Sequence, residues 1–251
     1  MAYPTLETAT APRNISYKRV LEGVYNLYGI EEETAQTRDW KLVRDFANNR
    51  LTDYWDLPEW PELVKTEQRS VVVDEEGEGA YIPFDEDGKK TIREVHGVFA
   101  KSPKAYHGEA AIEWWLSENG IQVPSTVGQT SVWVRYKWTK PELIGENHSA
   151  TATYEAGDQV YFNGDFYDAL EDIAAGETPT THPDGWDKVE IPYSARNYLI
   201  RGVYADMLEH DRADDNDVRR AESLAQRALD KELDGLYRRQ GQVRQIQVRG
   251  R

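Results

Sequence analysis

Amphipathic helical periodicity is confined to the two ends of this chain, and this distribution limits the folds that it can adopt. Between Ile191 and Gln240, apolar residues recur at three- and four-residue steps on both sides of an acid-rich turn, Asp211–Asp217. Such steps place side chains on one face of a helix, so this segment predicts two helices. The apolar stripe of the second contains Val218, Ala221, Leu224, Ala225, Ala228, Leu229, Leu233 and Leu236.

The N-terminal end has the same pattern. Ser16 is a suitable N-cap for a helix that begins at Tyr17, and Gly29 is a suitable stop signal after Tyr28. A second helix is expected from about Thr37 to Tyr54. Residues 1–14, with two prolines, are interpreted as a flexible arm.

Strand patterns lie only between these helical ends. Trp55–Pro61 contains two prolines and cannot continue a helix, so we interpret it as a rigid exit into β structure. Ala105–Gly120 is compatible with either a short helix or a strand. The strand candidates are Gln68–Val73, Tyr81–Pro83, Thr91–Lys101 and Ser131–Thr139.

The sequence therefore predicts an α+β fold in which two N-terminal and two C-terminal helices form one bundle around an inserted antiparallel β region. An extended C-terminal arm completes it. The expected domains are residues 15–55 with 191–240 for the bundle, 63–140 for the β region, 151–190 for a small β module and 241–251 for the arm.

Charge and composition exclude several classes of function. The net charge of -15 disfavours nucleic-acid binding except where arginines concentrate, and no apolar run is long enough to span a bilayer. With no cysteine, disulfides and thiolate metal sites are excluded. The five histidines are not spaced as metal ligands, and no phosphate-binding loop or nucleophile elbow is present. We expect no catalytic residue, no metal and no cofactor.

The C-terminal end differs from the rest of the chain because it is basic. Residues 238–251 contain five arginines and no acid. An arm of this composition fits the edge of a neighbour's sheet or a groove in a partner. The expected partner-binding residues are Arg238, Arg239, Val243, Arg244, Ile246, Val248, Arg249 and Arg251.

Residues 154–186 resemble the small chitin- and cellulose-binding modules of bacterial chitinases. The shared pattern begins at Tyr154 with Gly157 and Asp158, passes through the hairpin signal Asn163-Gly164, and ends at Trp186. The exposed aromatic pair of those modules is replaced here by residues 170–172, Leu-Glu-Asp. The resemblance implies glycan stacking by Tyr154, Tyr161, Tyr167 and Trp186.

The layout as a whole resembles the head-to-tail connector (adaptor) proteins of tailed bacteriophages. The resemblance rests on the terminal helices and the Arg/Gln-rich tail. It implies a structural protein of the virion neck, made in the host cytoplasm, in a ring of twelve copies between the portal protein and the tail or stopper proteins. DNA would pass through the ring without sequence-specific binding.

Two alternatives belong to other classes. A glycan- or receptor-binding virion protein would use exposed aromatic residues of the 154–186 module. A glycan-active enzyme would need a deep cleft with two close carboxylates. The phage type, the ring size and the neighbour that the arm contacts are open at this point.

Overall fold

The computed structural model describes residues 14–30, 37–57, 60–73, 80–86, 89–103, 111–118, 120–124 and 130–249. For residues 37–39, 85–86, 89–90 and 239–249 it describes the backbone alone. The expected N-terminal arm lies outside these residues, except for Asn14.

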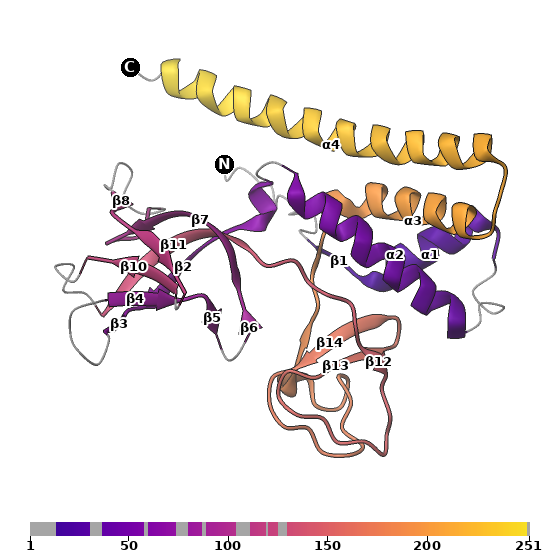
Figure 1. Cartoon of the computed structure of the whole chain (residues 1–251), viewed down its shortest axis with the longest axis horizontal. Helices are drawn as coiled ribbons and strands as arrows, with labels where there is room; N and C mark the ends of the chain where they lie inside the picture. The colour runs from indigo at the N-terminus through magenta and orange to yellow at the C-terminus, as the bar shows by residue number, and fades with distance from the viewer. Residues whose placement is uncertain are drawn as a thin grey trace, which may run out of the picture. The chain divides into compact units, whose positions relative to one another are not determined.

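The fold is α+β and divides into two compact units. The terminal unit combines Met1–Leu57 with Pro141–Arg251, and the inserted unit is Pro58–Lys140. The terminal unit contains four helices: α1 (Tyr17–Tyr28), α2 (Thr37–Asp56), α3 (Arg196–His210) and α4 (Asp215–Arg249) (Figure 1).

Helix α1 begins and ends where its local signals predict. The hydroxyl of Ser16 accepts a hydrogen bond from the backbone N–H of Arg19, and Gly29 adopts the left-handed conformation with φ of 75°. The buried face of α1 includes Val20 and Val24. Leu27, which follows Val24 by three residues and continues the helical spacing of this face, is nevertheless 42% exposed.

Helix α3 is the centre of the helical part, because it contacts α1, α2 and α4. Burial therefore extends around most of α3, beyond the single stripe that the sequence predicts. Its buried residues are Tyr198, Leu199, Ile200, Gly202, Val203, Ala205 and Met207.

A two-stranded sheet joins the two ends of the terminal unit. Strand β1 (Asn14–Ile15) pairs antiparallel with β16 (Ile191–Pro192), so Ile15 lies opposite Ile191. Both of these isoleucines are buried. The chain therefore enters α1 and leaves the small module toward α3 at the same place.

The prediction of an extended C-terminal arm is wrong. Helix α4 continues through the predicted boundary at residue 241 and ends at Arg249. Arginine and glutamine are good helix formers, so the basic composition of this segment does not end the helix.

The small module (residues 142–190) belongs to the terminal unit. Its sheet has the order β12-β13-β14-β15. Asn163 and Gly164 have φ of 51° and 90°, as the predicted hairpin turn requires. The strands are β12 (Glu146–Asn147), β13 (Gln159–Phe162), β14 (Asp165–Ala169) and β15 (Trp186–Lys188).

The inserted unit contains two four-stranded sheets around one apolar core. One sheet has the order β2-β11-β7-β8: β2 (Val64–Ser70), β11 (Ser131–Trp138), β7 (Ile92–Phe99) and β8 (Ala111–Ile112). The other has the order β3-β4-β10-β9: β3 (Val72–Val73), β4 (Ala80–Pro83), β10 (Gly120–Val123) and β9 (Trp115–Ser117). A short pair, β5 (Asp85–Glu86) and β6 (Lys89–Lys90), is separate.

The two sheets of the inserted unit meet at both margins. Only Val71 separates β2 from β3, and its N–H donates to the carbonyl of Thr130 at 2.9 Å. At the other margin, two residues separate β8 from β9. Ala105–Gly120, which was open between helix and strand, contains strands β8 and β9 and the start of β10, and no helix, among its described residues. The enclosed core contains Ala80, Ile82, Ile92, Val98, Ile121, Val123, Val132, Val134 and Tyr136.

We predict different costs for alanine at two glycines with positive φ. A Cβ at Gly29 would have open space, whereas a Cβ at Gly164 would lie 2.9 Å from Cγ of Lys18. Gly29→Ala should therefore lower the free energy of unfolding by the backbone cost alone, about 1 kcal/mol, and Gly164→Ala by more. Urea unfolding of both variants measures this. Equal losses would show that the hairpin does not press against α1.

Candidate interaction site

The small module packs on α1 and α2 through four aromatic rings, which we name the aromatic junction: Tyr17, Trp40, Tyr161 and Phe166. The rings of Trp40 and Tyr161 are stacked, with centroids 4.0 Å apart and planes 9° from parallel. Tyr17 and Phe166 meet edge to face at 5.0 Å. The hydroxyl of Tyr17 donates to the carbonyl of Trp40 at 2.9 Å. Tyr161 thus stacks on a ring of its own chain.

Of the other three residues expected to stack on glycans, Trp186 lies in the core of the small module, where it is 5% exposed, and Tyr154 and Tyr167 are partly buried against it. The rings of Tyr154 and Trp186 are 5.5 Å apart, edge to face. The structure therefore brings these three together and separates them from Tyr161, which faces the helices.

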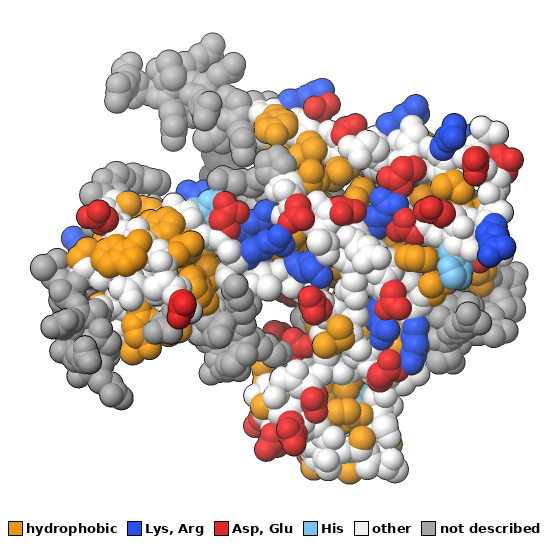
Figure 2. All heavy atoms as spheres, in the orientation of Figure 1, with side chains coloured by type: hydrophobic (Ala, Val, Ile, Leu, Met, Phe, Trp, Pro, Cys, Tyr) orange, Lys and Arg blue, Asp and Glu red, His pale blue; other side chains and the backbone are white. Residues whose placement is uncertain are grey.

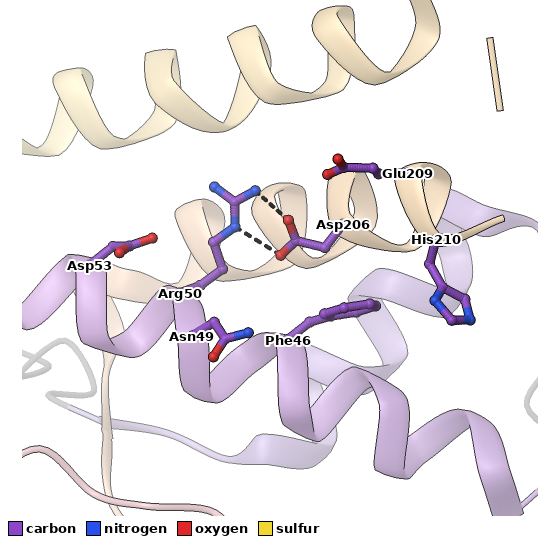
Figure 3. Close-up of a pocket in the computed structure, with 7 residues that line it drawn as sticks. All are labelled: Phe46, Asn49, Arg50, Asp53, Asp206, Glu209 and His210. Carbon is purple, nitrogen blue, oxygen red and sulfur yellow. Dashed lines mark hydrogen bonds and ion pairs between the residues drawn. The ribbon is translucent and has the colours of Figure 1, made fainter. Parts of the chain in front are cut away.

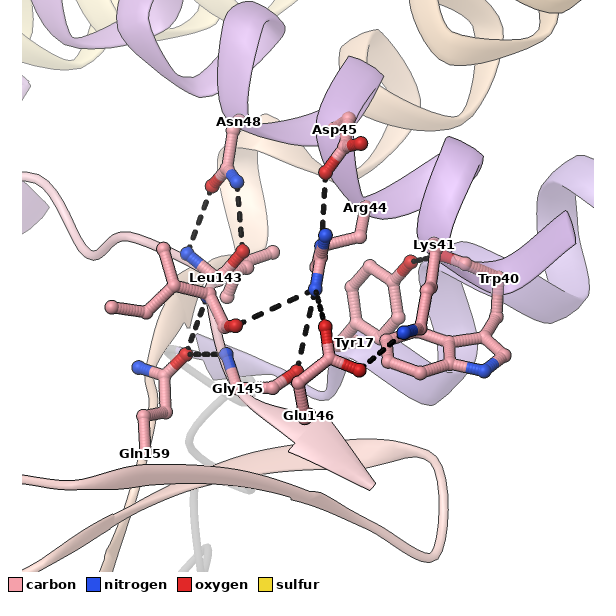
Figure 4. A network of polar contacts seen from close by, with 11 residues as sticks. Tyr17, Trp40, Lys41, Arg44, Asp45, Asn48, Leu143, Gly145, Glu146 and Gln159 are labelled. Carbon is pink, nitrogen blue, oxygen red and sulfur yellow. Dashed lines mark hydrogen bonds and ion pairs between the residues drawn. The ribbon is translucent and has the colours of Figure 1, made fainter. Parts of the chain in front are cut away.

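Polar contacts beside the aromatic junction join α2 to residues 143–146 (Figure 4). The Asn48 side chain makes two hydrogen bonds with the backbone of Leu143, at 2.8 and 2.9 Å. Arg44 lies 3.6 Å from Glu146, which also pairs with Lys41. The hydrogen bond from Lys41 is the main reason that the pKa of Glu146 lies below its ordinary value.

Helix α4 packs on α3 through two alanines and a leucine. Ala221, Ala225 and Leu229 follow one another at four-residue steps and are all buried. Alanine at two of these positions lets two helix backbones approach closely. The predicted stripe is thus the face that contacts α3, although Leu224 lies outside it and is 36% exposed.

Arg50 of α2 pairs with Asp206 of α3 (Figure 3) and with Glu222 of α4. Its guanidinium donates two hydrogen bonds to Asp206, at 2.6 and 2.9 Å, and two to Glu222, at 2.7 and 3.0 Å. Burial acts to lower the pKa of Arg50, but the hydrogen bonds from both carboxylates outweigh burial and raise it. Gly202 leaves room for this arginine, because a Cβ there would meet Cδ of Arg50 at 3.0 Å.

The hollow beside Arg50 has the composition of an ion-pair network. It is lined by Phe46, Asn49, Arg50, Asp53, Asp206, Glu209 and His210. The ring centroids of His210 and Phe46 are 6.1 Å apart, and the two rings are arranged edge to face. Since Arg50 already pairs with Asp206, we interpret the hollow as a structural junction between α2 and α3.

The C-terminal half of α4 extends beyond α3. Helix α4 has 35 residues and is about 52 Å long, whereas the 15 residues of α3 span about 22 Å. Figure 1 shows α4 continuing past the end of α3. Leu236 is buried, but Tyr237 is 55% exposed and Arg238 is also exposed.

The expected partner-binding residues lie on this projecting part of α4. Arg238 has an exposed side chain, and Arg251 lies outside the described residues. The remaining six lie on a stretch of α4 for which the backbone is described: Arg239, Val243, Arg244, Ile246, Val248 and Arg249.

Metal and membrane sites receive no support from the described part of the chain. Its histidines and carboxylates form no group of three or more that could hold a metal ion. None of the helices described there combines the length and the apolar composition needed to cross a bilayer. No model of a known protein family matches the chain, and no curated protein matches it.

Sequence patterns alone did not identify Arg50 or the Trp40–Tyr161 stack. The helical stripe of α2 does include Trp40, which marks it as a buried residue but does not name its partner. Arg50 follows no pattern at all, because a single arginine on a helix is usually solvated.

We predict that Arg50→Gln loosens α4. The loss should lower the free energy of unfolding by about 2 kcal/mol, below the ~3–5 kcal/mol of a fully buried pair, because the side chain of Glu222 is 46% exposed. Amide hydrogen exchange should accelerate in residues 215–229. The matched control is Arg227→Gln, an exposed arginine of α4, which should change stability by less than about 0.5 kcal/mol. Unchanged exchange in α4 would contradict the role of Arg50.

We also predict a pH-dependent contribution from Glu146. Because its pKa is lowered in the folded chain, its contribution to stability is present above the ordinary carboxyl pKa of 4.5 and disappears as the pH falls below it. Glu146→Gln should therefore be less stable than the parent at pH 7, and this difference should be smaller near pH 3. Urea unfolding at both pH values measures the difference. A gap of equal size in acid would assign the effect to packing.

Proposed function

We propose that this chain is a structural head-to-tail connector of a tailed bacteriophage. Copies form a ring at the virion neck, between the portal protein and the tail or stopper proteins, and DNA passes through the ring. The observation that carries the proposal is the C-terminal half of α4, a projecting helix that has four arginines and no acid from residue 238 to residue 249.

The contacts that hold the N-terminal half of α4 in place support an anchoring role. A projecting helix transmits force to its own subunit only if its base is fixed. The base of α4 is fixed by Ala221, Ala225 and Leu229 against α3, and by Arg50 through Glu222. The projecting half is therefore suited to holding a neighbouring protein.

The distribution of charge supports passage of DNA. The chain carries a net charge of -15, although its last fourteen residues are basic. Figure 2 shows acidic side chains interspersed with basic ones on the visible surface of the terminal unit, and the net charge of the chain is negative. A surface of this sign repels the phosphate backbone, so DNA would slide past it without being held.

The packing of the small module favours a structural function over glycan binding. A residue that binds sugar by stacking must present a free ring face. Tyr161 is covered by Trp40, and Trp186 is buried, so both contribute to the stability of the terminal unit. In this proposal the chain is not an enzyme, because joining two assemblies requires no chemical step.

We predict that the basic end of α4 is needed for attachment to the portal. A chain truncated after Tyr237 should fold, since the residues that contact α3 remain, but should not bind purified portal complexes. Reversal of Arg238, Arg239 and Arg244 to Glu should also abolish binding. Co-sedimentation with portal complexes measures both.

The matched control reverses three exposed arginines at the base of the same helix, Arg219, Arg220 and Arg227. This variant should bind portal complexes as the parent does. Equal binding by all variants would contradict the anchoring role. Immunogold label at the tail fibres instead of the neck would favour adhesion to a receptor.

A further inference from the structure

Helix α4 keeps one helical register from its contact with α3 to its end at Arg249. Residues seven apart in a helix lie almost on the same face, with a drift of about 20° per step. Leu229 and Leu236 are seven residues apart, and both are buried. Val243 follows at the next step. The face that is buried at the two leucines therefore continues along α4 to position 243.

Beyond Leu236 this face combines apolar and basic positions. At about 100° per residue, Val243 lies about 20° from Leu236 around the helix axis, and Ile246 lies about 80° from it. Arg239 and Arg244 lie on the two sides of this line, at about 60° and 80°. We name these four positions, Arg239, Val243, Arg244 and Ile246, the α4 end face.

The two other arginines of this stretch lie on the opposite side of the helix. Arg238 and Arg249 are about 160° and 140° from Leu236 around the axis. An extended chain would divide the four arginines differently, because alternate residues of a strand share a side. Arg239 would then share a side with Arg249, and Arg238 with Arg244. The helical structure of α4 therefore determines which arginines can act together.

A partner that covers the α4 end face would stabilise the end of the helix. Most helical stability in proteins comes from the packing of an apolar face, and glycine weakens a helix relative to alanine. Residues 238–249 include Gly241. A partner surface that buries Val243 and Ile246 would offset this weakness. DNA would leave both residues without an apolar contact, so a protein surface is the better match.

We propose that the end of α4 binds the portal as a helix, with the α4 end face in a groove that has an apolar floor and acidic walls. Val243 and Ile246 match the floor, because amphipathic helices bind grooves through apolar residues at three- and four-residue steps. Arg239 and Arg244 match carboxylates on the two walls, because a guanidinium pairs with a carboxylate through two parallel hydrogen bonds. The inference rests on the proposed function for the identity of the partner, and it adds the chemistry of the partner's surface.

The first test reverses two arginines on one side of the helix at a time, in the full chain. Arg239→Glu with Arg244→Glu should weaken binding to purified portal complexes at least about a hundredfold, because acidic side chains would then face acidic walls. The matched control, Arg238→Glu with Arg249→Glu, makes the same change of charge on the opposite side. It should weaken binding less than about tenfold, because salt screens exposed charges. Biolayer interferometry on immobilised portal complexes measures the dissociation constants.

Two further experiments test the apolar floor and the helical state. Val243→Ser should weaken binding about tenfold or more, whereas Val248→Ser, the same change about 140° away around the axis, should alter it less than about twofold. Gly241→Ala should tighten binding up to about fivefold, because this position lies away from the α4 end face and alanine favours the helix. Circular dichroism checks that each variant retains the fold of the parent.

The outcomes separate this inference from the proposed function. Equal losses in the two arginine pairs are the result expected of an extended arm, so they would overturn the helical groove and leave the anchoring role in place. A larger loss in the control pair would overturn the assigned face. Portal binding that survives every variant and truncation after Tyr237 would contradict the anchoring role itself. Tighter binding to a DNA duplex than to portal complexes would overturn the protein groove.

Discussion

The terminal unit depends on the stacked rings of Trp40 and Tyr161, because this contact joins helix α2 to the small module, which lies more than 80 residues further along the chain. One ring lies on a helix near the N-terminus and the other on a strand of the small module. Tyr17 and Phe166 enclose the pair, and Asn48 fixes the chain that enters the module. The module therefore packs on both α1 and α2 and is an integral part of the terminal unit.

A second constraint orders the C-terminal helices. The guanidinium of Arg50 satisfies Asp206 and Glu222 together, and this planar bidentate geometry is one that lysine cannot reproduce. The angle between α2, α3 and α4 is thus set by charge as well as by packing. Because this junction fixes the orientation of α4, a force on the projecting half of α4 would be transmitted to α2 and α3.

Features that depend on neighbouring residues could be predicted from the sequence, and features that depend on distant partners could not. Asn163-Gly164 predicted its hairpin because few other residue pairs accept two positive φ angles. The end of α4 was misplaced because a change from acidic to basic composition does not break a helix. The row of Val72, Tyr81, Gln122 and Trp115 could not be foreseen, since it arises only when four separate strands pair in register.

The pairing of the chain's two ends has a consequence during synthesis. Arg50 is separated from Asp206 by 156 residues. At about 5–20 residues per second, a ribosome needs roughly 8–30 s to make that stretch. During this time the apolar faces of α1 and α2 have been made but lack the partners that bury them. Burial of these faces against α3 is therefore delayed until synthesis reaches the last quarter of the chain.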